Sequence, residues 1–218
     1  MPMAKPSFSE IQTWVFDLDN TLYHPSVRLF DQIERRMTDW VMTALNVDRP
    51  RADFLRQDYW QRYGTTLAGL MAEHDVDPAP YLHEVHDIDF SALAPDPELA
   101  QTLSDLPGRV IVYTNGCTPY AEKVLQGRGL SGVFDAIYGV EHADFLPKPD
   151  RAAFEKVFEK DGVNPARSAM FEDDPRNLLA PHDMGMATVL VSETAASHEH
   201  IDHATRDLHH FLKSTQEH

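Results

Sequence analysis

Cysteine is nearly absent from the sequence: Cys117 is the single cysteine in 218 residues, so no disulfide can form within the chain. Nothing in the composition therefore suggests an oxidising compartment, and we expect a cytoplasmic protein. Long apolar runs are also missing. No segment approaches the ~20 apolar residues that cross a bilayer, and the N-terminus has no apolar stretch typical of a secretion signal. We expect an unprocessed chain with no membrane partner.

Basic residues are scarce as well. The chain has 19 lysines and arginines against 35 acidic residues, which gives a formal net charge of -16. Such a charge repels nucleic acid polymers and anionic membranes, so neither is an expected partner. An anionic small molecule remains possible, but its site needs a local source of positive charge such as a divalent cation, a lysine or a helix N-terminus.

What the sequence does contain is an alternation of strands and helices. Thr118 and Pro119 form a typical helix start, and Asp150 is a typical N-cap for a helix that ends at Gly162. Short apolar runs rich in β-branched and aromatic residues separate the helices. They predict buried strands at 13–16, 110–113, 136–140, 169–171 and 188–191. This order predicts an α/β fold with a doubly wound, Rossmann-like parallel sheet.

One segment breaks this rhythm. Roughly ninety residues separate the first two strands, although a βαβ unit takes only ~30. Apolar residues at helical spacing fill the segment, with helices expected near 30–44, 51–63, 65–73 and 78–85. We predict two domains: an α/β core made of residues 1–22 and 94–218, and an all-helical cap, residues 23–93, inserted after the first strand. The cap is expected to cover a site at the carboxyl ends of the strands.

Two carboxylates, Asp17 and Asp19, follow the first predicted strand. Residues two apart at a strand end lie on the same side of the backbone, where two carboxylates repel each other unless they share a proton or a cation. A hard, oxygen-ligated cation such as Mg²⁺ is the simplest solution.

The other strand ends carry complementary groups. The second strand is followed by Thr-Asn-Gly at 114–116, the third by Lys148, and the fourth by the acidic run 172–174. Taken singly, each has an ordinary interpretation as a cap or a solvated charge. Taken together, hydrogen-bond donors, a lysine and carboxylates at neighbouring strand ends indicate a phosphate site with a metal ion.

These motifs, in this order, resemble the four motifs of the haloacid dehalogenase superfamily, and the inserted helices take the place of its helical cap. The resemblance covers about residues 14–191. Within the superfamily, the stretches 17–23, 59–70 and 171–177 resemble the pyrimidine 5′-nucleotidase family. Pro181 interrupts the helix that the family has after the last motif, so we expect that helix to be short or kinked.

The resemblance implies a role for each motif residue. It implies that Asp17 is a nucleophile that forms an aspartyl phosphate, and that Asp19 protonates the leaving alkoxide and then activates water. Lys148 is expected to pair with both the nucleophile and the phosphate. The other implied roles are phosphate binding by Thr114, Asn115, Gly116 and Lys148, and Mg²⁺ coordination by the Asp17 side chain, the Asp19 backbone carbonyl and Asp173, with Glu172 as an outer-sphere contact.

The implied function is that of an enzyme, a Mg²⁺-dependent phosphomonoesterase acting on nucleoside 5′-monophosphates, with the pyrimidine nucleotides UMP, CMP and dTMP favoured. The dehalogenases of the superfamily lack a carboxylate at the position of Asp19. Its presence here favours phosphoryl transfer over cleavage of a carbon–halogen bond. A sugar-phosphate phosphatase or phosphomutase is an alternative, because a glutamate at position 172 resembles the pattern of the sugar phosphomutase branch. A non-enzymatic phosphoacceptor such as a response-regulator receiver fits less well, because its motifs come in a different order. A scaffold on a catalytically inactive fold also fits less well, because it usually lacks one of the motif residues.

Substrate choice is expected to reside in the cap. Arg56 and Arg62 are candidates for it, and the aromatic residues Tyr59, Trp60 and Tyr63 are expected to be mostly core, with one or two free to stack on a base.

Cys117 and the histidine-rich tail both have ordinary interpretations. No histidine stands near Cys117 in the sequence to activate it as a nucleophile. We therefore expect Cys117 to be a small, non-catalytic residue near the site. The histidine-rich tail is expected to be solvated rather than metal-binding, with a short helix at 204–212.

Overall fold

The computed structural model describes residues 5–194 and 198–216. In chain order the helices and strands are β1 (Thr13–Phe16), α1 (Leu29–Leu45), α2 (Arg49–Tyr63), α3 (Thr66–His74), α4 (Pro78–Val85), α5 (Pro97–Ser104), β2 (Arg109–Tyr113), α6 (Thr118–Gly127), β3 (Ala136–Tyr138), α7 (Arg151–Asp161), β4 (Ser168–Glu172), α8 (Leu179–Asp183), β5 (Ala187–Val191), β6 (His203–Thr205) and α9 (Leu208–Gln216).

The strands form one parallel sheet in the order β3-β2-β1-β4-β5-β6. β1 lies inside the sheet, where Thr13 aligns with Arg109 of β2 and with Ser168 of β4. The strand order reverses direction at β1, and in open α/β sheets ligands bind beyond the carboxyl ends of the strands at such a point. The doubly wound α/β fold predicted from the sequence is confirmed.

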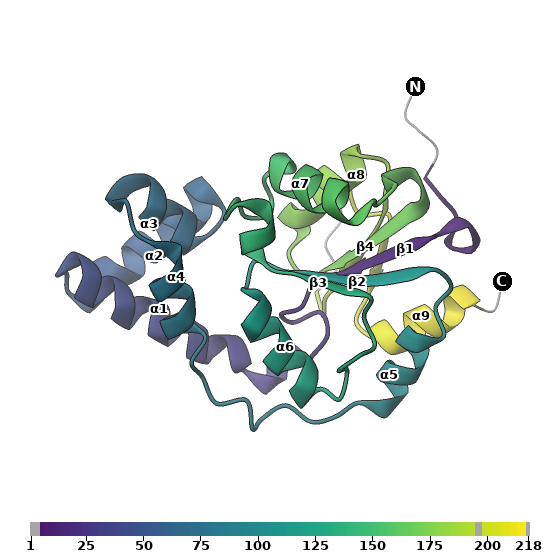
Figure 1. Cartoon of the computed structure of the whole chain (residues 1–218), viewed down its shortest axis with the longest axis horizontal. Helices are drawn as coiled ribbons and strands as arrows, with labels where there is room; N and C mark the ends of the chain where they lie inside the picture. Colours follow the sequence, from purple (N-terminus) through teal and green to yellow (C-terminus); the bar gives the residue numbers. More distant parts are fainter. Residues whose placement is uncertain (1–4, 195–197, 217–218) are drawn as a thin grey trace.

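Helices cover both faces of the sheet, with α5, α6 and α9 on one side and α7 and α8 on the other (Figure 1). Successive residues of β1 point to opposite faces. Trp14 and Phe16 accordingly belong to the apolar cluster under α5, α6 and α9, whereas Val15 packs with Phe154 of α7. Burial on both faces explains the apolar run from Trp14 to Phe16 in this strand.

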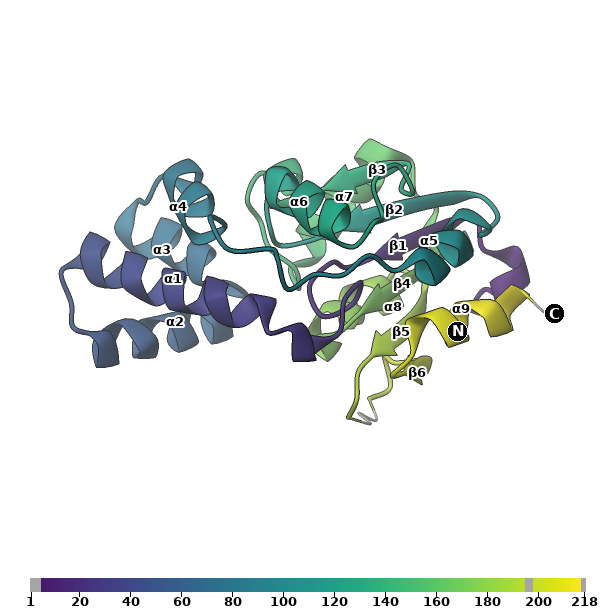
Figure 2. The same cartoon turned by 90° about the horizontal axis from the view of Figure 1, so that it is seen from below.

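The helices α1 to α4 form a separate body beside the sheet (Figures 1 and 2). They pack around their own apolar cluster, which includes Val41, Leu55, Tyr59 and Tyr81. Side chains cap the helix starts, as where the Asp48 carboxylate accepts a hydrogen bond from a backbone N–H of α2. The chain enters this body directly after β1 and returns to the sheet through α5 (Figure 2). The domain boundaries at 22/23 and 93/94 stay predictions.

The structure differs from the predicted elements in three places. β3 ends at Tyr138 instead of continuing to Val140, because Gly139 begins a turn and the Val140 N–H donates to the Gly116 carbonyl. The predicted helix at 204–212 is wrong in its first half, since 203–205 form the edge strand β6 against β5 and α9 begins only at Leu208. The helix α5 was not predicted.

The expectation of a short helix around Pro181 is confirmed, since α8 has five residues. None of the helices in the described ranges, 5–194 and 198–216, combines the length and apolar character needed to cross a membrane.

Candidate active site

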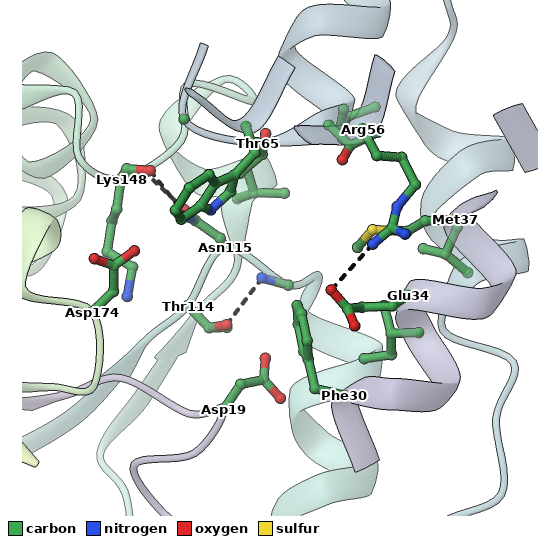
Figure 3. A pocket seen from close by; sticks show the side chains of 18 of the residues that line it. Asp19, Phe30, Glu34, Met37, Arg56, Thr65, Thr114, Asn115, Lys148 and Asp174 are labelled. Carbon is green, nitrogen blue, oxygen red and sulfur yellow. Dashed lines mark hydrogen bonds and ion pairs between the residues drawn. The ribbon is translucent and has the colours of Figure 1, made fainter. Parts of the chain in front are cut away.

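A cavity of about 710 Å³ lies between the carboxyl ends of the strands and the helical body (Figure 3). One wall comes from the ends of β1, β2 and β4 and from the loop that holds Lys148. The other wall comes from α1, α2 and α4 and from the start of α3. The structure therefore brings the motif residues of four separate segments to one place, which also contacts the inserted helices.

Asp17 and Lys148 form a buried ion pair at the floor of this cavity. Asp17 directly follows β1, and its backbone N–H donates to the Phe171 carbonyl of β4 at 2.9 Å. Lys148 Nζ donates to Asp17 Oδ1 at 2.7 Å, while Thr21 Oγ1 donates to Oδ2 at 3.2 Å. Burial raises the pKa of Asp17 to about 8, with the nearby Glu172 adding to the rise and Lys148 opposing it.

Lys148 also binds a second carboxylate. Its Nζ donates to Glu172 Oε2 at 2.7 Å and to the Tyr113 carbonyl at 3.0 Å. Burial lowers the pKa of Lys148, but the two carboxylates outweigh burial and hold that pKa above its ordinary value, so the lysine is charged. Burial raises the pKa of Glu172 to about 7, opposed by Lys148. Glu172 Oε1 accepts from Asn177 Nδ2 at 3.1 Å. Both oxygens of Glu172 therefore have protein partners.

The carboxylates of Asp17, Glu172 and Asp173 form a set that suits a hard cation. Each offers one oxygen within 4.8 Å of the others. Asn20 Nδ2 donates to Asp173 Oδ2 at 3.1 Å and so orients that side chain. Three carboxylates face one lysine, and an oxygen-ligated divalent ion would relieve the excess negative charge. Burial raises the pKa of Asp173 to about 7, as expected for carboxylates crowded without such an ion.

Asp19 is held by two tyrosines. The hydroxyls of Tyr23 and Tyr120 both donate to Asp19 Oδ1, the former at 2.6 Å. Burial raises the pKa of Asp19, and the two hydroxyls oppose that rise. Neither tyrosine was predicted from the sequence as a site residue. Tyr23 stands four residues after Asp19, at the end of the stretch 17–23, whereas nothing in the sequence links Tyr120 of α6 to this carboxylate.

The segment Thr114 to Gly116 lines the cavity at the end of β2. Thr114 Oγ1 accepts from the Gly116 N–H at 2.9 Å. A side chain at Gly116 would meet the Tyr120 ring at 2.8 Å, so the close approach of α6 requires glycine. The Asn115 amide contacts the backbone of Lys148, accepting from its N–H at 2.8 Å and donating to its carbonyl at 3.1 Å. Asn115 thus fixes the loop that presents the lysine, and phosphate binding by the three residues stays a prediction.

The two arginines that the sequence offered for substrate choice differ in position. Arg56 lines the cavity (Figure 3), whereas Arg62 does not. Arg62 instead forms ion pairs with Asp58 at 2.7 Å and with Glu73 at 2.6 Å.

The aromatic residues of α2 also differ in their surroundings. Tyr59 is buried in the core of the helical body, as expected for most of them. Trp60 is 46% exposed and lines the cavity. The Arg176 guanidinium, from the segment after β4, lies 3.5 Å from the centre of the Trp60 ring, so this ring joins the helical body to the core.

His86, at the end of α4, is a cavity residue that no sequence motif indicated. Its Nδ1 lies 3.2 Å from Cys117 Sγ, and its ring stacks on Tyr120 at 4.3 Å between centroids. Burial lowers the pKa of His86 to about 4 and raises the pKa of Cys117. Both side chains are therefore neutral, which argues against a thiolate nucleophile.

Among residues 5–194 and 198–216, the acidic set at 17, 172 and 173 is the one group of at least three metal-ligating side chains that the structure brings together. The described tail histidines lie elsewhere. His200 Nε2 contacts the Pro175 carbonyl at 2.8 Å, and its ring stacks on His198.

Comparison with known proteins identifies the class of protein. A family model of haloacid dehalogenase-like hydrolases matches residues 11–185, which is most of the chain. The protein therefore belongs to the haloacid dehalogenase-like hydrolase family, as the motif order had indicated.

Two relatives carry names from phosphate chemistry. The chain is 25% identical to phosphate metabolism protein 8 of Saccharomyces cerevisiae over 227 aligned residues, covering 94% of this chain and 71% of the yeast protein. It is 30% identical to glyceraldehyde 3-phosphate phosphatase of Methanothermobacter thermautotrophicus over 126 residues, about half of each chain (54%).

Solved structures share the fold. A haloacid dehalogenase-type phosphatase from Thermococcus onnurineus superposes with a TM-score of 0.62 and 18% identity, covering 94% of this chain and 97% of that one. An L-2-haloacid dehalogenase from Xanthobacter autotrophicus, with chloropropionic acid covalently bound, gives 0.60 and 17% over 94% and 98%. A phosphatase and a dehalogenase thus share this fold, and the side chains must discriminate between these activities.

Proposed function

We propose that this protein is a Mg²⁺-dependent phosphomonoesterase that hydrolyses nucleoside 5′-monophosphates, with the pyrimidine nucleotides UMP, CMP and dTMP as substrates. The observation that carries the proposal is the arrangement of Asp17 against Lys148 at 2.7 Å in a cavity that Asp19 also lines. A nucleophilic carboxylate, a cation and a second carboxylate are the groups that a two-step phosphoryl transfer needs.

In the first step Asp17 attacks the substrate phosphorus. A bond forms between an Asp17 carboxylate oxygen and phosphorus, and the bond from phosphorus to the ester oxygen breaks. Asp19, protonated at the start, gives its proton to the leaving alkoxide, so the nucleoside departs as a neutral alcohol. Lys148 stabilises the negative charge on the phosphoryl oxygens. The products of this step are the alcohol and an aspartyl phosphate.

In the second step water attacks the aspartyl phosphate. Asp19, now a carboxylate, takes a proton from the water as its oxygen bonds to phosphorus, and the bond from phosphorus to Asp17 breaks. Inorganic phosphate leaves, and both carboxyl groups return to their starting states. The hydroxyls of Tyr23 and Tyr120 hold Asp19 for both proton transfers.

The acidic set fits the proposed Mg²⁺. Asp17, Asp173 and the backbone carbonyl of Asp19 would hold the ion, which supplies positive charge to the phosphoryl group when it is bound. Glu172 is committed to Lys148 and Asn177 by hydrogen bonds. Its role in the proposal is to keep the lysine charged and in place, with at most an outer-sphere contact to the metal. Thr114, Asn115 and Gly116 would bind phosphate oxygens at the same edge.

Two lines support the substrate class. The stretches 17–23, 59–70 and 171–177 resemble the pyrimidine 5′-nucleotidases, and the cavity of about 710 Å³ falls in the ~300–1,000 Å³ range typical of small-molecule sites. A second candidate is a small sugar phosphate, because one relative is named glyceraldehyde 3-phosphate phosphatase.

The test is phosphate release with Mg²⁺ from UMP, CMP, dTMP, AMP, GMP, glyceraldehyde 3-phosphate, glucose 6-phosphate and glucose 1-phosphate, each beside an EDTA control. We expect the pyrimidine nucleotides to lead by about tenfold in kcat/KM, a difference of ~1.4 kcal/mol in transition-state binding. We expect EDTA to stop the reaction. A lead by sugar phosphates would replace the nucleotidase proposal, and interconversion of the glucose phosphates without net release would indicate a mutase.

A further inference from the structure

One wall of the cavity carries a carboxylate that the proposed chemistry does not use. Phe30, Ile33, Glu34 and Met37 of α1 all line the cavity. Their spacing of three and four residues places them on one face of the helix. Figure 3 shows Glu34 between Phe30 and Met37, with its carboxylate joined to Arg56 of α2.

Arg56 holds Glu34 in this position. Arg56 donates to Glu34 Oε1 at 3.3 Å and to Thr38 Oγ1 at 2.8 Å, and Asp53 lies 3.7 Å from the same guanidinium. The arginine side chain is 16% exposed, whereas that of Glu34 is 53% exposed. The arginine is thus the inner part of the pair, and the carboxylate is the part that a ligand can reach.

The charges on this wall favour some ligands over others. Glu34 and Asp53 face a single arginine, so the wall has an excess of one negative charge. A second phosphate or a carboxylate on the substrate would be repelled there. An N–H or O–H group would find an acceptor in Glu34, and the Phe30 and Met37 side chains offer apolar contact to a flat ring.

We propose that Glu34 recognises the end of the substrate remote from the phosphate. It accepts a hydrogen bond from an uncharged ring there and repels a second anionic group. Arg56 acts as a positioning residue for it. This inference rests on the proposed function, because a nucleobase is the uncharged, hydrogen-bonding ring that it describes. It adds a preference among phosphate esters that the catalytic residues do not provide, since those residues contact only the phosphate end of the substrate.

The experiment compares kcat/KM for UMP and for fructose 1,6-bisphosphate, which has a second phosphate at the remote end. Glu34→Gln removes the charge but keeps an acceptor, and Glu34→Met removes both. For Glu34→Gln we expect the preference for UMP over the bisphosphate to fall by at least about fivefold. For Glu34→Met we expect an additional rise in the KM for UMP.

Asp31→Asn is the matched control. Asp31 lies on the same helix one turn earlier, pairs with Arg28 at 2.7 Å and does not line the cavity. The control removes the same charge from the same helix, so we expect the UMP preference to be unchanged. Thermal unfolding of each variant checks that the helical body is intact.

Arg56 provides an independent variant if a Glu34 substitution disturbs folding. We expect Arg56→Gln to raise the KM for UMP, because Glu34 is then no longer held in place, and Arg56→Lys, which keeps a charge beside Glu34, to raise it less. A rise in the KM for UMP that lysine does not partly reverse would contradict the positioning role.

The outcomes separate this inference from the function that it rests on. If the wild-type enzyme hydrolyses no nucleotide better than the sugar phosphates, the proposed function fails and the inference falls with it. If the wild-type enzyme prefers UMP but Glu34→Gln keeps the same preference as Asp31→Asn, the inference alone is overturned.

Discussion

The two walls of the cavity differ in how their charges are held. On the core wall, the side chains of Lys148, Asp17 and Glu172 are 1%, 7% and 2% exposed, and the lysine contacts both carboxylates at 2.7 Å. On the helical wall, Glu34 is 53% exposed and its contact to Arg56 measures 3.3 Å. The charged groups of the core wall are thus buried, and the lysine contacts both carboxylates. The proposed recognition group, Glu34, is exposed and held by one partner.

This difference has an energetic basis. A buried charge that loses its partner remains in a poorly solvated place, whereas an exposed charge is solvated by water when its partner is removed. We therefore expect the core wall to lose stability when a substitution leaves one of its buried charges without a partner. We expect the helical wall to tolerate substitution, so that its substrate preference can change without loss of the fold or the chemistry.

The largest expected effect is on the core wall, from Asp17→Asn. The amide can still accept from Lys148, so we expect the fold to persist, but an amide is too poor a nucleophile to form the covalent intermediate. Phosphate release should become undetectable while the circular dichroism spectrum is unchanged. Near wild-type release by this variant would disprove the proposed mechanism.

The next effect is expected from Asp19→Ala, which removes the proton donor and acceptor but not the nucleophile. We expect a loss of about 10²–10⁴-fold in kcat, the usual range for general acid–base catalysis. Because Asp19 acts in both steps, rapid-quench measurements should show slower formation and slower hydrolysis of the aspartyl phosphate. Tyr23→Phe, which keeps Asp19 but removes one of its hydrogen bonds, should have a smaller effect. Rapid turnover by Asp19→Ala would mean that another group transfers the proton.

Stability offers a direct test of the contrast between the walls. Lys148→Met leaves Asp17 and Glu172 buried together without a cation, and we expect the free energy of unfolding to fall by about 3 kcal/mol. Adding Glu172→Gln should restore part of the loss, because one of the two uncompensated charges is then gone. Urea unfolding without added metal measures both. Equal stability of wild type and Lys148→Met would remove the distinction drawn between the walls.

His86 lies where the two walls meet, and it predicts a pH dependence. Its pKa is lowered by burial to about 4, against about 6.5 in an unfolded chain. Between these values the unfolded state binds a proton that the folded state does not, so stability is lost as the pH falls from about 6.5 to about 4. At pH 5 this amounts to roughly 2 kcal/mol.

His86→Gln removes the titrating group, so the variant should lose less stability than the wild type between pH 7 and pH 5 in parallel urea titrations. Equal losses in the two proteins would show that His86 does not cause the acid sensitivity.

The sequence predicted the core wall better than the helical wall, for a physical reason. Asp17, Thr114 and Asp173 each directly follow a buried strand, Lys148 lies in the loop after β3, and parallel strands bring their carboxyl ends to one edge of the sheet. A local pattern was therefore enough to gather them.

The partners of these residues depend on contacts between distant segments, which no local pattern encodes. His86 reaches Cys117 across 31 residues, and the Tyr120 hydroxyl reaches Asp19 across 101. Glu34 was not singled out because its role depends on which face of α1 meets the cavity. The strand β6 was missed for a similar reason, since its pairing with β5 outweighs the helical pattern around Ala204.

The smallest expected effect belongs to Arg62, which the sequence could not distinguish from Arg56. Both lie on α2, but Arg62 pairs with Asp58 and Glu73 away from the cavity. Exposed ion pairs of this kind contribute little, because water solvates the charges when a pair is broken. We expect Arg62→Gln to change kcat/KM for UMP by less than about twofold, while Arg56→Gln raises the KM for UMP more strongly. A rise in KM in the Arg62 variant as large as in the Arg56 variant would mean that α2 acts through its overall charge. Recognition would then not depend on the side chain that faces the cavity.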